Sequence, residues 1–201
     1  MKIVSDFKDF YDEAVESSEL YGIYRRINGE TLNRKQGLEY LKTKGIATID
    51  CDFAKNIGFW DCEEVVVFTE PNTHNIEKRI KMSKDTAMQY YPNHIVMPFI
   101  SREFTGGITL KYLKIGRKHW NITLINKTDI LTDGMVYSIE YIKPNDSRLE
   151  TPIWSIDYIK DKDGKWVAID YNDNPIIGYM DSRLKPQDVL NEIAWFCSRQ
   201  E

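Results

Sequence analysis

The chain has 201 residues and a formal net charge of −4, with 42% hydrophobic and 29% charged residues. This balance is ordinary for a globular protein, and the length suits one large domain or two small lobes. Because the chain as a whole is slightly acidic, its charge gives no general drive toward nucleic acid or an acidic membrane surface.

Cysteine and histidine usage argues against several kinds of site. The three cysteines, Cys51, Cys62 and Cys197, have no CxxC spacing, and the three histidines are scattered. We therefore expect neither a structural zinc site nor a Ser-His-Asp triad. An odd cysteine count without an N-terminal apolar run favours a reducing, cytoplasmic location. No apolar run approaches the roughly 18 residues that a membrane-spanning helix needs.

The first hundred residues predict alternating helices and strands. Helices are expected at 6–17 after a Ser5 cap, at 32–44 between a Thr31 cap and Gly45, and at 73–90. The last of these rests on Ile76, Ile80 and Ala87, which share one helical face. Strands are expected at 21–27, 46–51, 64–68 and 95–100.

From residue 108 onward the pattern becomes β-rich. Strands are expected at 109–115, 119–126, 136–142, 154–160 and 166–171, and an amphipathic helix follows Pro186. The fold class is therefore α+β or mixed α/β. We expect an N-terminal α/β lobe over 1–100 and a β-rich lobe over 101–201, facing each other across a cleft, or else one continuous domain.

The most informative segment is 151–179, which reads as two strands joined by a turn at 162–165. Asp170 and Asn172 point to one face because side chains alternate along a strand, and Asp157 should lie opposite them. Three oxygen donors on one face suit Mg²⁺ held together with nucleotide phosphates. The alternative is that the run from Asp170 to Pro175 is ordinary turn composition.

These residues resemble the last hairpin of the ATP-grasp fold, in which an aspartate and a Glu-x-Asn pair bind the Mg²⁺ ions that bridge ATP phosphates. Asp157 matches the first position, Asp170 stands where the family has glutamate, and Asn172 matches the asparagine. The likeness covers about residues 95–197. It implies a two-lobed ATP-grasp-like architecture, with ATP and Mg²⁺ as cofactors.

The resemblance also suggests roles for residues upstream of the hairpin. The strand at 95–100, which contains Met97, is similar to the strand leading to the family's adenine-binding hinge, and Arg102 follows it. Met97 is then a nucleotide contact and Arg102 a contact for the carboxylate substrate. We expect three basic residues to face the phosphates: Lys111, Lys114 and Arg117. Lys111 and Lys114 are also expected to have a catalytic role.

One position departs from the family pattern. The strand at 64–68 lies where the family has a lysine that contacts nucleotide phosphates, and Phe68 occupies that position here. Phenylalanine cannot bind phosphate in that way. Either Lys111 or Lys114 takes over the contact, or the protein no longer performs ligation.

Three functions remain open at this stage. The first is an ATP-dependent carboxylate–amine ligase acting on a small carboxylate or a peptide. The second is a non-catalytic protein of the kind found in bacteriophages, which binds a host protein or sequesters a nucleotide in the host cytoplasm. The third is a purely structural or accessory phage protein. The N-terminal residues 1–14 resemble the start of small phage and bacterial proteins, which bears on origin and not on chemistry.

Overall fold

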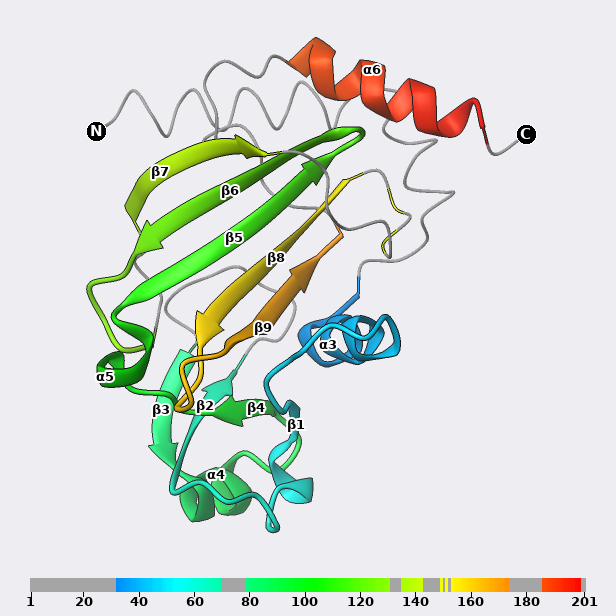
Figure 1. Ribbon diagram of the computed structural model, residues 1–201. Helices are drawn as coiled ribbons and strands as arrows, with labels where there is room; N and C mark the ends of the chain where they lie inside the picture. Colours follow the sequence, from blue (N-terminus) through cyan, green and yellow to red (C-terminus); the bar gives the residue numbers. More distant parts are fainter. Residues whose placement is uncertain are drawn as a thin grey trace.

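In the described part of the chain, two antiparallel sheets are joined and covered by helices (Figure 1). The structure is a computed structural model, and it describes residues 32–69, 79–130, 135–142, 149, 151, 153–173 and 186–199. The large sheet has the order β7-β6-β5-β8-β9 and the small one β1-β4-β2-β3. The large sheet contains β5 (Ile108–Ile115), β6 (Lys118–Ile125), β7 (Met135–Ile142), β8 (Ile153–Lys160) and β9 (Trp166–Asn172). The small sheet contains β1 (Asp52–Phe53), β2 (Glu64–Phe68), β3 (Arg79–Ser83) and β4 (Ile95–Pro98). This confirms the predicted mixed α+β class.

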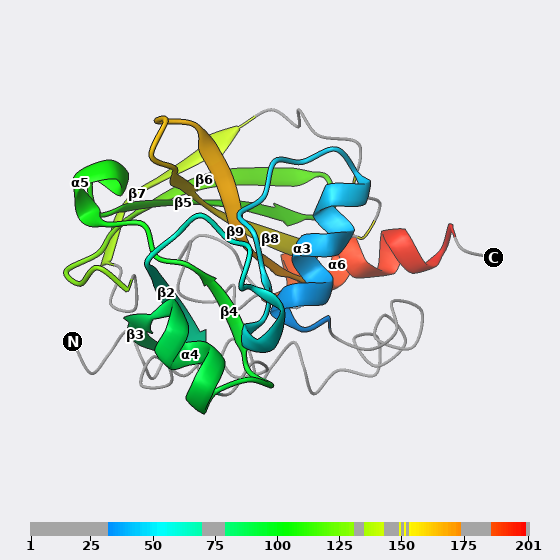
Figure 2. The same ribbon diagram turned by 90° about the horizontal axis from the view of Figure 1, so that it is seen from below.

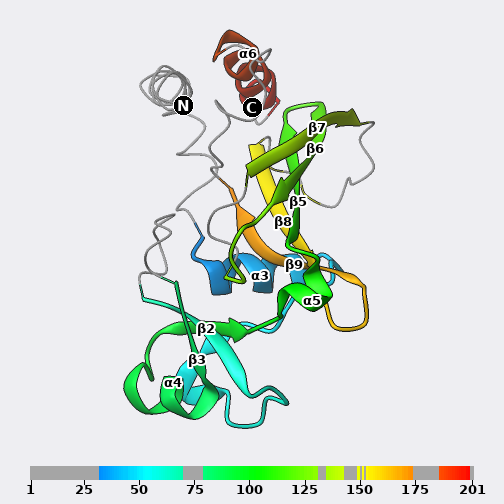
Figure 3. The ribbon, with the colours of Figure 1, turned by 90° about the vertical axis from the view of Figure 1, so that its left-hand side faces the viewer.

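The small sheet forms the lower part of the molecule, and α4 (Lys84–Tyr90) covers its outer face (Figures 1 and 3). Strand β2 explains this arrangement, since its residues alternate between two sides. Val65 and Val67 pack with Ala87 of α4, whereas Val66 and Phe68 face the large sheet's core. The 3-10 turn η1 (Ala54–Asn56) packs beside α4.

The predicted helix at 73–90 is wrong over much of its length. Residues 79–83 form strand β3, which pairs with β2 from Phe68↔Arg79 to Glu64↔Ser83. The helix begins only at Lys84, because the side chain of Ser83 accepts a hydrogen bond from Thr86 N at 3.2 Å and caps it. The expected elements at 6–17 and 21–27, and residues 73–78, lie outside the described residues.

Helix α3 (Arg34–Thr43) packs against β9 (Figure 2). It begins one residue after Asn33, which forms a capping box with Gln36 and is the cap in place of the expected Thr31. Gly37 permits the close approach, because a Cβ there would lie 3.2 Å from the Cβ of Tyr171. The predicted strand at 46–51 is instead a single parallel bridge between Thr48 and Ala168.

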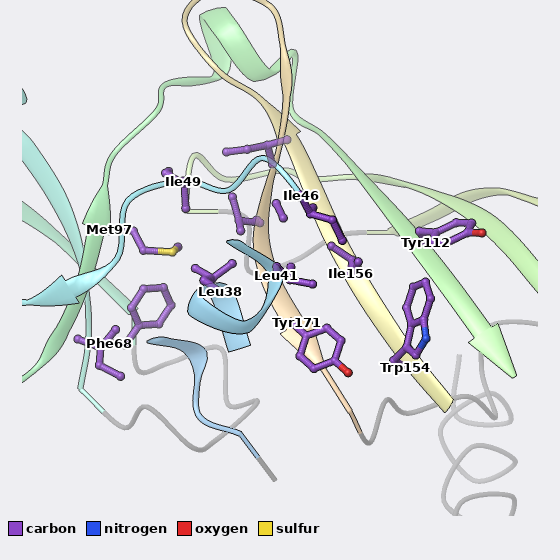
Figure 4. Close-up of a cluster of buried hydrophobic side chains, with 14 of the residues drawn as sticks. Leu38, Leu41, Ile46, Ile49, Phe68, Met97, Tyr112, Trp154, Ile156 and Tyr171 are labelled. Carbon is purple, nitrogen blue, oxygen red and sulfur yellow. The ribbon is translucent and has the colours of Figure 1, made fainter. Parts of the chain in front are cut away.

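The main core lies between α3 and one face of the large sheet (Figure 4). Leu38 and Leu41 of α3 pack with Trp154 and Ile156 of β8 and with Tyr171 of β9. Trp154 and Ile156 have no exposed surface, so their burial contributes strongly to stability. The opposite face of these strands carries the charged residues Asp157 and Asp170.

Strands β8 and β9 form the predicted hairpin, and the turn chemistry is visible. Asp161 Oδ1 accepts hydrogen bonds from the backbone N–H groups of Asp163 and Lys165, and Gly164 has a φ of 76°. One irregularity follows, since Asp157 pairs with Asp170 but Tyr158 pairs with Ala168. Ile169 is therefore the extra residue of a β-bulge, beside the residues singled out in the sequence.

Helix α6 (Pro186–Cys197) lies above the end of the large sheet where β5 turns into β6 (Figures 1 and 3). Its Glu192 is buried and pairs with Arg117 of that turn. None of the helices in the described part of the chain combines the length and hydrophobicity that a membrane crossing needs.

Candidate functional site

A cavity of about 240 Å³ lies between the two sheets. The small sheet lines it with Val66, Phe68, Arg79 and Met97, and the large sheet lines it with Thr109, Lys111, Asp157 and Asp170. Arg34, the first residue of α3, completes the wall where the two sheets approach each other. We call this cavity the inter-sheet cleft.

Three charged residues form a row across the large sheet at the cleft. Lys111 of β5 is paired with Asp157 of β8, and Asp157 is paired with Asp170 of β9. Residues directly opposite each other on neighbouring strands share a face, so all three side chains point the same way. The hairpin register predicted from the sequence therefore brings the two carboxylates together.

Asn172 lies one step beyond this row. It is opposite Ser155, and the pleat places it on the same face as Asp170. It is not among the residues that line the cleft. The predicted oxygen set is thus arranged as two carboxylates in the cleft and one amide just outside it.

The two carboxylates are balanced by cations from different elements. Lys111 Nζ lies 2.8 Å from Asp157 Oδ1, and Arg34 Nη1 lies 3.0 Å from Asp170 Oδ1. Arg34 Nη1 also donates a hydrogen bond to the carbonyl of Ile169 at 2.8 Å, which fixes its position beside the bulge. In this state both acidic groups are held by the chain's own positive charges.

The residues present fit a magnesium ion shared with phosphates. Asp157 Oδ1 is buried and makes no hydrogen bond of good geometry with any described residue, although Lys111 Nζ is close to it. Ser155 Oγ on the same face is likewise buried with no hydrogen-bond partner in the described part of the chain. Mg²⁺ is commonly held by one or two carboxylates, with phosphate and water oxygens completing six ligands. Among the described residues, no group of three His, Cys, Asp or Glu side chains lies together in a way that could hold a metal ion by itself.

The wall of the cleft formed by the small sheet is largely apolar, and two arginines lie against its Phe68 ring. The guanidinium carbon of Arg34 lies 4.4 Å from the centre of the Phe68 ring, and that of Arg79 lies 5.6 Å from it. Burial, with a further contribution from Arg34, lowers the pKa of Arg79 to about 10, so Arg79 stays protonated at neutral pH. Met97, the expected nucleotide contact, is paired with Val66 and lies in the same wall.

Three predicted site residues do not reach the cleft, which corrects the sequence interpretation. Lys114 is three positions from Lys111 and so points to the other face, where its Nζ donates to the carbonyl of Leu149 and lies 5.9 Å from the Trp154 ring. Arg117 makes its ion pair with Glu192 of α6. Arg102 of α5 (Arg102–Thr105) donates a hydrogen bond to the carbonyl of Lys127.

Arg34 and Arg79 were missed by sequence reasoning. Arg34 contacts a carbonyl 135 positions away, a distance that no local pattern reveals. Arg79 belongs to a basic run that also reads as the solvated face of a helix. One signal could have found Arg79. A second strand following the strand that ends at Phe68 would pair with it in an antiparallel way and bring Arg79 beside Phe68, where the family has its lysine.

Comparison with known proteins gives a likeness of fold. No protein-family model matches the sequence, and no curated protein matches it significantly. Among solved structures, a RiPP-associated ATP-grasp ligase of Chryseobacterium gregarium, in complex with ADP and a leader and core peptide, matches with a TM-score of 0.55 at 12% identity. The match covers 90% of this chain and 62% of that one.

Two further structures agree. The ATP-grasp ligase PsnB, complexed with the precursor peptide PsnA2 and AMPPNP, has a TM-score of 0.53 at 10% identity, covering 91% of this chain and 61% of that one. The D-alanine-D-alanine ligase of Coxiella burnetii has a TM-score of 0.50 at 12% identity, covering 84% and 58%. The chain thus spans about 60% of the length of these ligases, and it has an ATP-grasp-like fold.

Proposed function

We propose that this protein binds ATP with Mg²⁺ in the inter-sheet cleft and uses it to activate a carboxylate. The observation that carries the proposal is the pairing of Asp157 with Asp170 inside a cleft between two antiparallel sheets, with Lys111 beside them. The likeness to ATP-grasp ligases supports it, although at such low identity that likeness concerns the fold.

Each cleft residue has a role that its position supports. Asp157 and Asp170 would hold Mg²⁺, with Asn172 adding its amide oxygen. Lys111 would bind a phosphate oxygen, and the wall formed by Val66 and Met97 would pack against the base. The cation, when bound, supplies charge neutralisation on the phosphoryl group.

The reaction that we infer is the one that the likeness to ATP-grasp ligases supports. A substrate carboxylate oxygen attacks the terminal phosphorus of ATP, and the bond from that phosphorus to the bridging oxygen breaks to release ADP. An amine nitrogen then attacks the acyl carbon and inorganic phosphate leaves, taking the electron pair of the acyl–oxygen bond, while the nitrogen loses a proton to solvent. Peptides accompany the nucleotide in two of the similar structures, so a peptide is a suitable substrate class beside a small carboxylate.

The experiment is thermal unfolding with ATP, with and without Mg²⁺. A ligand at about 100 times its dissociation constant stabilises a protein by roughly 2.7 kcal/mol, which is readily measured. We expect a Mg²⁺-dependent shift that Asp170→Asn abolishes and Asp163→Asn keeps. Asp163 is the matched control because it is exposed in the turn of the same hairpin. No shift with any nucleotide contradicts the proposal.

A second candidate is nucleotide binding without turnover, and Phe68 at the usual lysine position favours it. The two functions separate in one assay. ADP formation in the presence of carboxylate and amine substrates supports the ligase. Tight ATP binding with no ADP formed across a broad substrate panel supports sequestration.

A further inference from the structure

Two cations lie beside Phe68, the position at which the resemblance to the ATP-grasp fold leads us to expect a lysine. Phe68 and Arg79 are directly opposite each other on β2 and β3, so both point into the inter-sheet cleft. Arg34 reaches the same ring from the start of α3. Two elements that are separate in sequence therefore deliver guanidinium groups to one aromatic ring.

Arg34 is largely buried, and not all of its N–H groups have a hydrogen-bond partner among the described residues. Only 10% of its side chain is exposed, and Nη1 serves both Asp170 and the carbonyl of Ile169. Its Nε is buried and has no hydrogen-bond partner among the described residues. A buried guanidinium N–H without a partner costs free energy, and a ligand oxygen would remove that cost.

The charges around Arg34 also point to an anion. Within the cleft the cations Arg34, Arg79 and Lys111 face the carboxylates Asp157 and Asp170, and Asp129 is exposed at the rim. Each of two carboxylates already has a partner, Lys111 or Arg34. Arg79 adds a half-buried positive charge close to Arg34, and the repulsion between the two guanidinium groups at one aromatic ring would be relieved further by a bound anion.

We propose that Arg34 and Arg79, held against the Phe68 ring, bind the phosphates of the nucleotide in place of the lysine expected at position 68. The planar fork of a guanidinium binds two phosphate oxygens at once, and stacking on an aromatic ring fixes its orientation. The Phe68 side chain is then a platform for the two arginines. This assignment rests on the proposed function, because it names the residues that hold the phosphates of the same ligand.

The test is a calorimetric titration of the full chain with Mg²⁺-ATP, inorganic tripolyphosphate and AMP. Arg79→Gln is the informative variant, because loss of Arg34 would also leave Asp170 without its partner. We expect affinity for ATP and tripolyphosphate to fall at least tenfold, as for other lost charged hydrogen bonds, while AMP affinity changes little. Lys81→Gln is the matched control, since Lys81 lies two residues along the same strand, is exposed, pairs with Glu64 and is not among the residues that line the cleft.

A second variant guards against misfolding. Arg79→Lys keeps the charge and loses the fork, so we expect an intermediate loss of ATP affinity with unchanged thermal unfolding of the free protein. Equal losses in Lys81→Gln and Arg79→Gln, or unchanged ATP binding in Arg79→Gln and Arg79→Lys, overturn the assignment but leave the proposed function standing. Failure of the unmodified protein to bind ATP overturns both.

Discussion

The two faces of the large sheet are built from the same strands but hold opposite chemistry. Toward α3, Trp154 and Ile156 are fully buried in an apolar core (Figure 4). Toward the small sheet, Lys111, Asp157 and Asp170 form a charged row. Side chains alternate between the two faces along each strand, so neighbouring residues such as Ile156 and Asp157 lie on opposite faces. One of them contributes to the core and the other to the cleft.

The largest effect should come from the apolar face. Trp154→Ala removes a fully buried side chain, and we expect it to lower the free energy of unfolding by about 3–5 kcal/mol. Trp166→Ala, in the same hairpin but 40% exposed, should cost less, about 1–2 kcal/mol, because only part of its side chain is buried. Denaturant titrations of both variants measure the difference, and equal losses would break the contrast between the faces.

The next effect belongs to the charged face. Asp157→Asn replaces a carboxylate of the row, and we expect Mg²⁺-dependent ATP affinity to fall roughly 100-fold, equivalent to about 2.7 kcal/mol. Calorimetric titration with and without Mg²⁺ measures this. An Asp157→Asn protein that binds Mg²⁺-ATP normally would show that the row is only an internal ion pair.

Two lysines on one strand give the sharpest comparison. Lys111→Gln should weaken ATP binding roughly tenfold or more, because a charged hydrogen bond is lost in the cleft. Lys114→Gln should leave binding unchanged, since its side chain lies on the other face near Trp154. Parallel ATP titrations decide, and a loss in Lys114→Gln as large as that in Lys111→Gln would contradict the assignment of faces.

The sequence was sufficient for the parts of this arrangement that depend on local rules. Alternation and turn chemistry predicted the β8–β9 hairpin and the pairing of Asp157 with Asp170. The same alternation, applied to Lys111 and Lys114, would have placed them on opposite faces. Arg34 was beyond reach, because it meets Asp170 only after α3 has packed on β9.

Strand β3 shows the other limit of sequence reasoning. Residues 79–83 carry a helix-like spacing together with residues 76 and 87, and only pairing with β2 makes them a strand. Tertiary contacts overrode the local pattern, because strand preference depends on the neighbouring strand and on same-face neighbours. Because residues 79–83 form a strand and not a helix, Arg79 lies beside Phe68 and lines the cleft.

A last effect appears only at high pH and concerns a thiol at the edge of the apolar core. Burial raises the pKa of the Cys51 thiol from 9.0 to about 12. The folded state then holds the proton more tightly than the unfolded state, so this stabilisation is complete below pH 9 and is lost as pH rises toward 12. We expect stability to fall by up to about 1.4 kcal/mol per pH unit in that window, and Cys51→Ala to remove that slope. Denaturant titrations from pH 8 to 10.5 measure it, and identical slopes in both proteins would contradict the assignment.

The most direct test of the account is a crystal structure grown with AMPPNP and Mn²⁺, whose anomalous signal locates the cation. We expect a peak bonded to carboxylate oxygens of Asp157 and Asp170, with the nucleotide's phosphates against Lys111 and the arginines. A nucleotide bound elsewhere, or carboxylates still held by Lys111 and Arg34 with no cation between them, would contradict it.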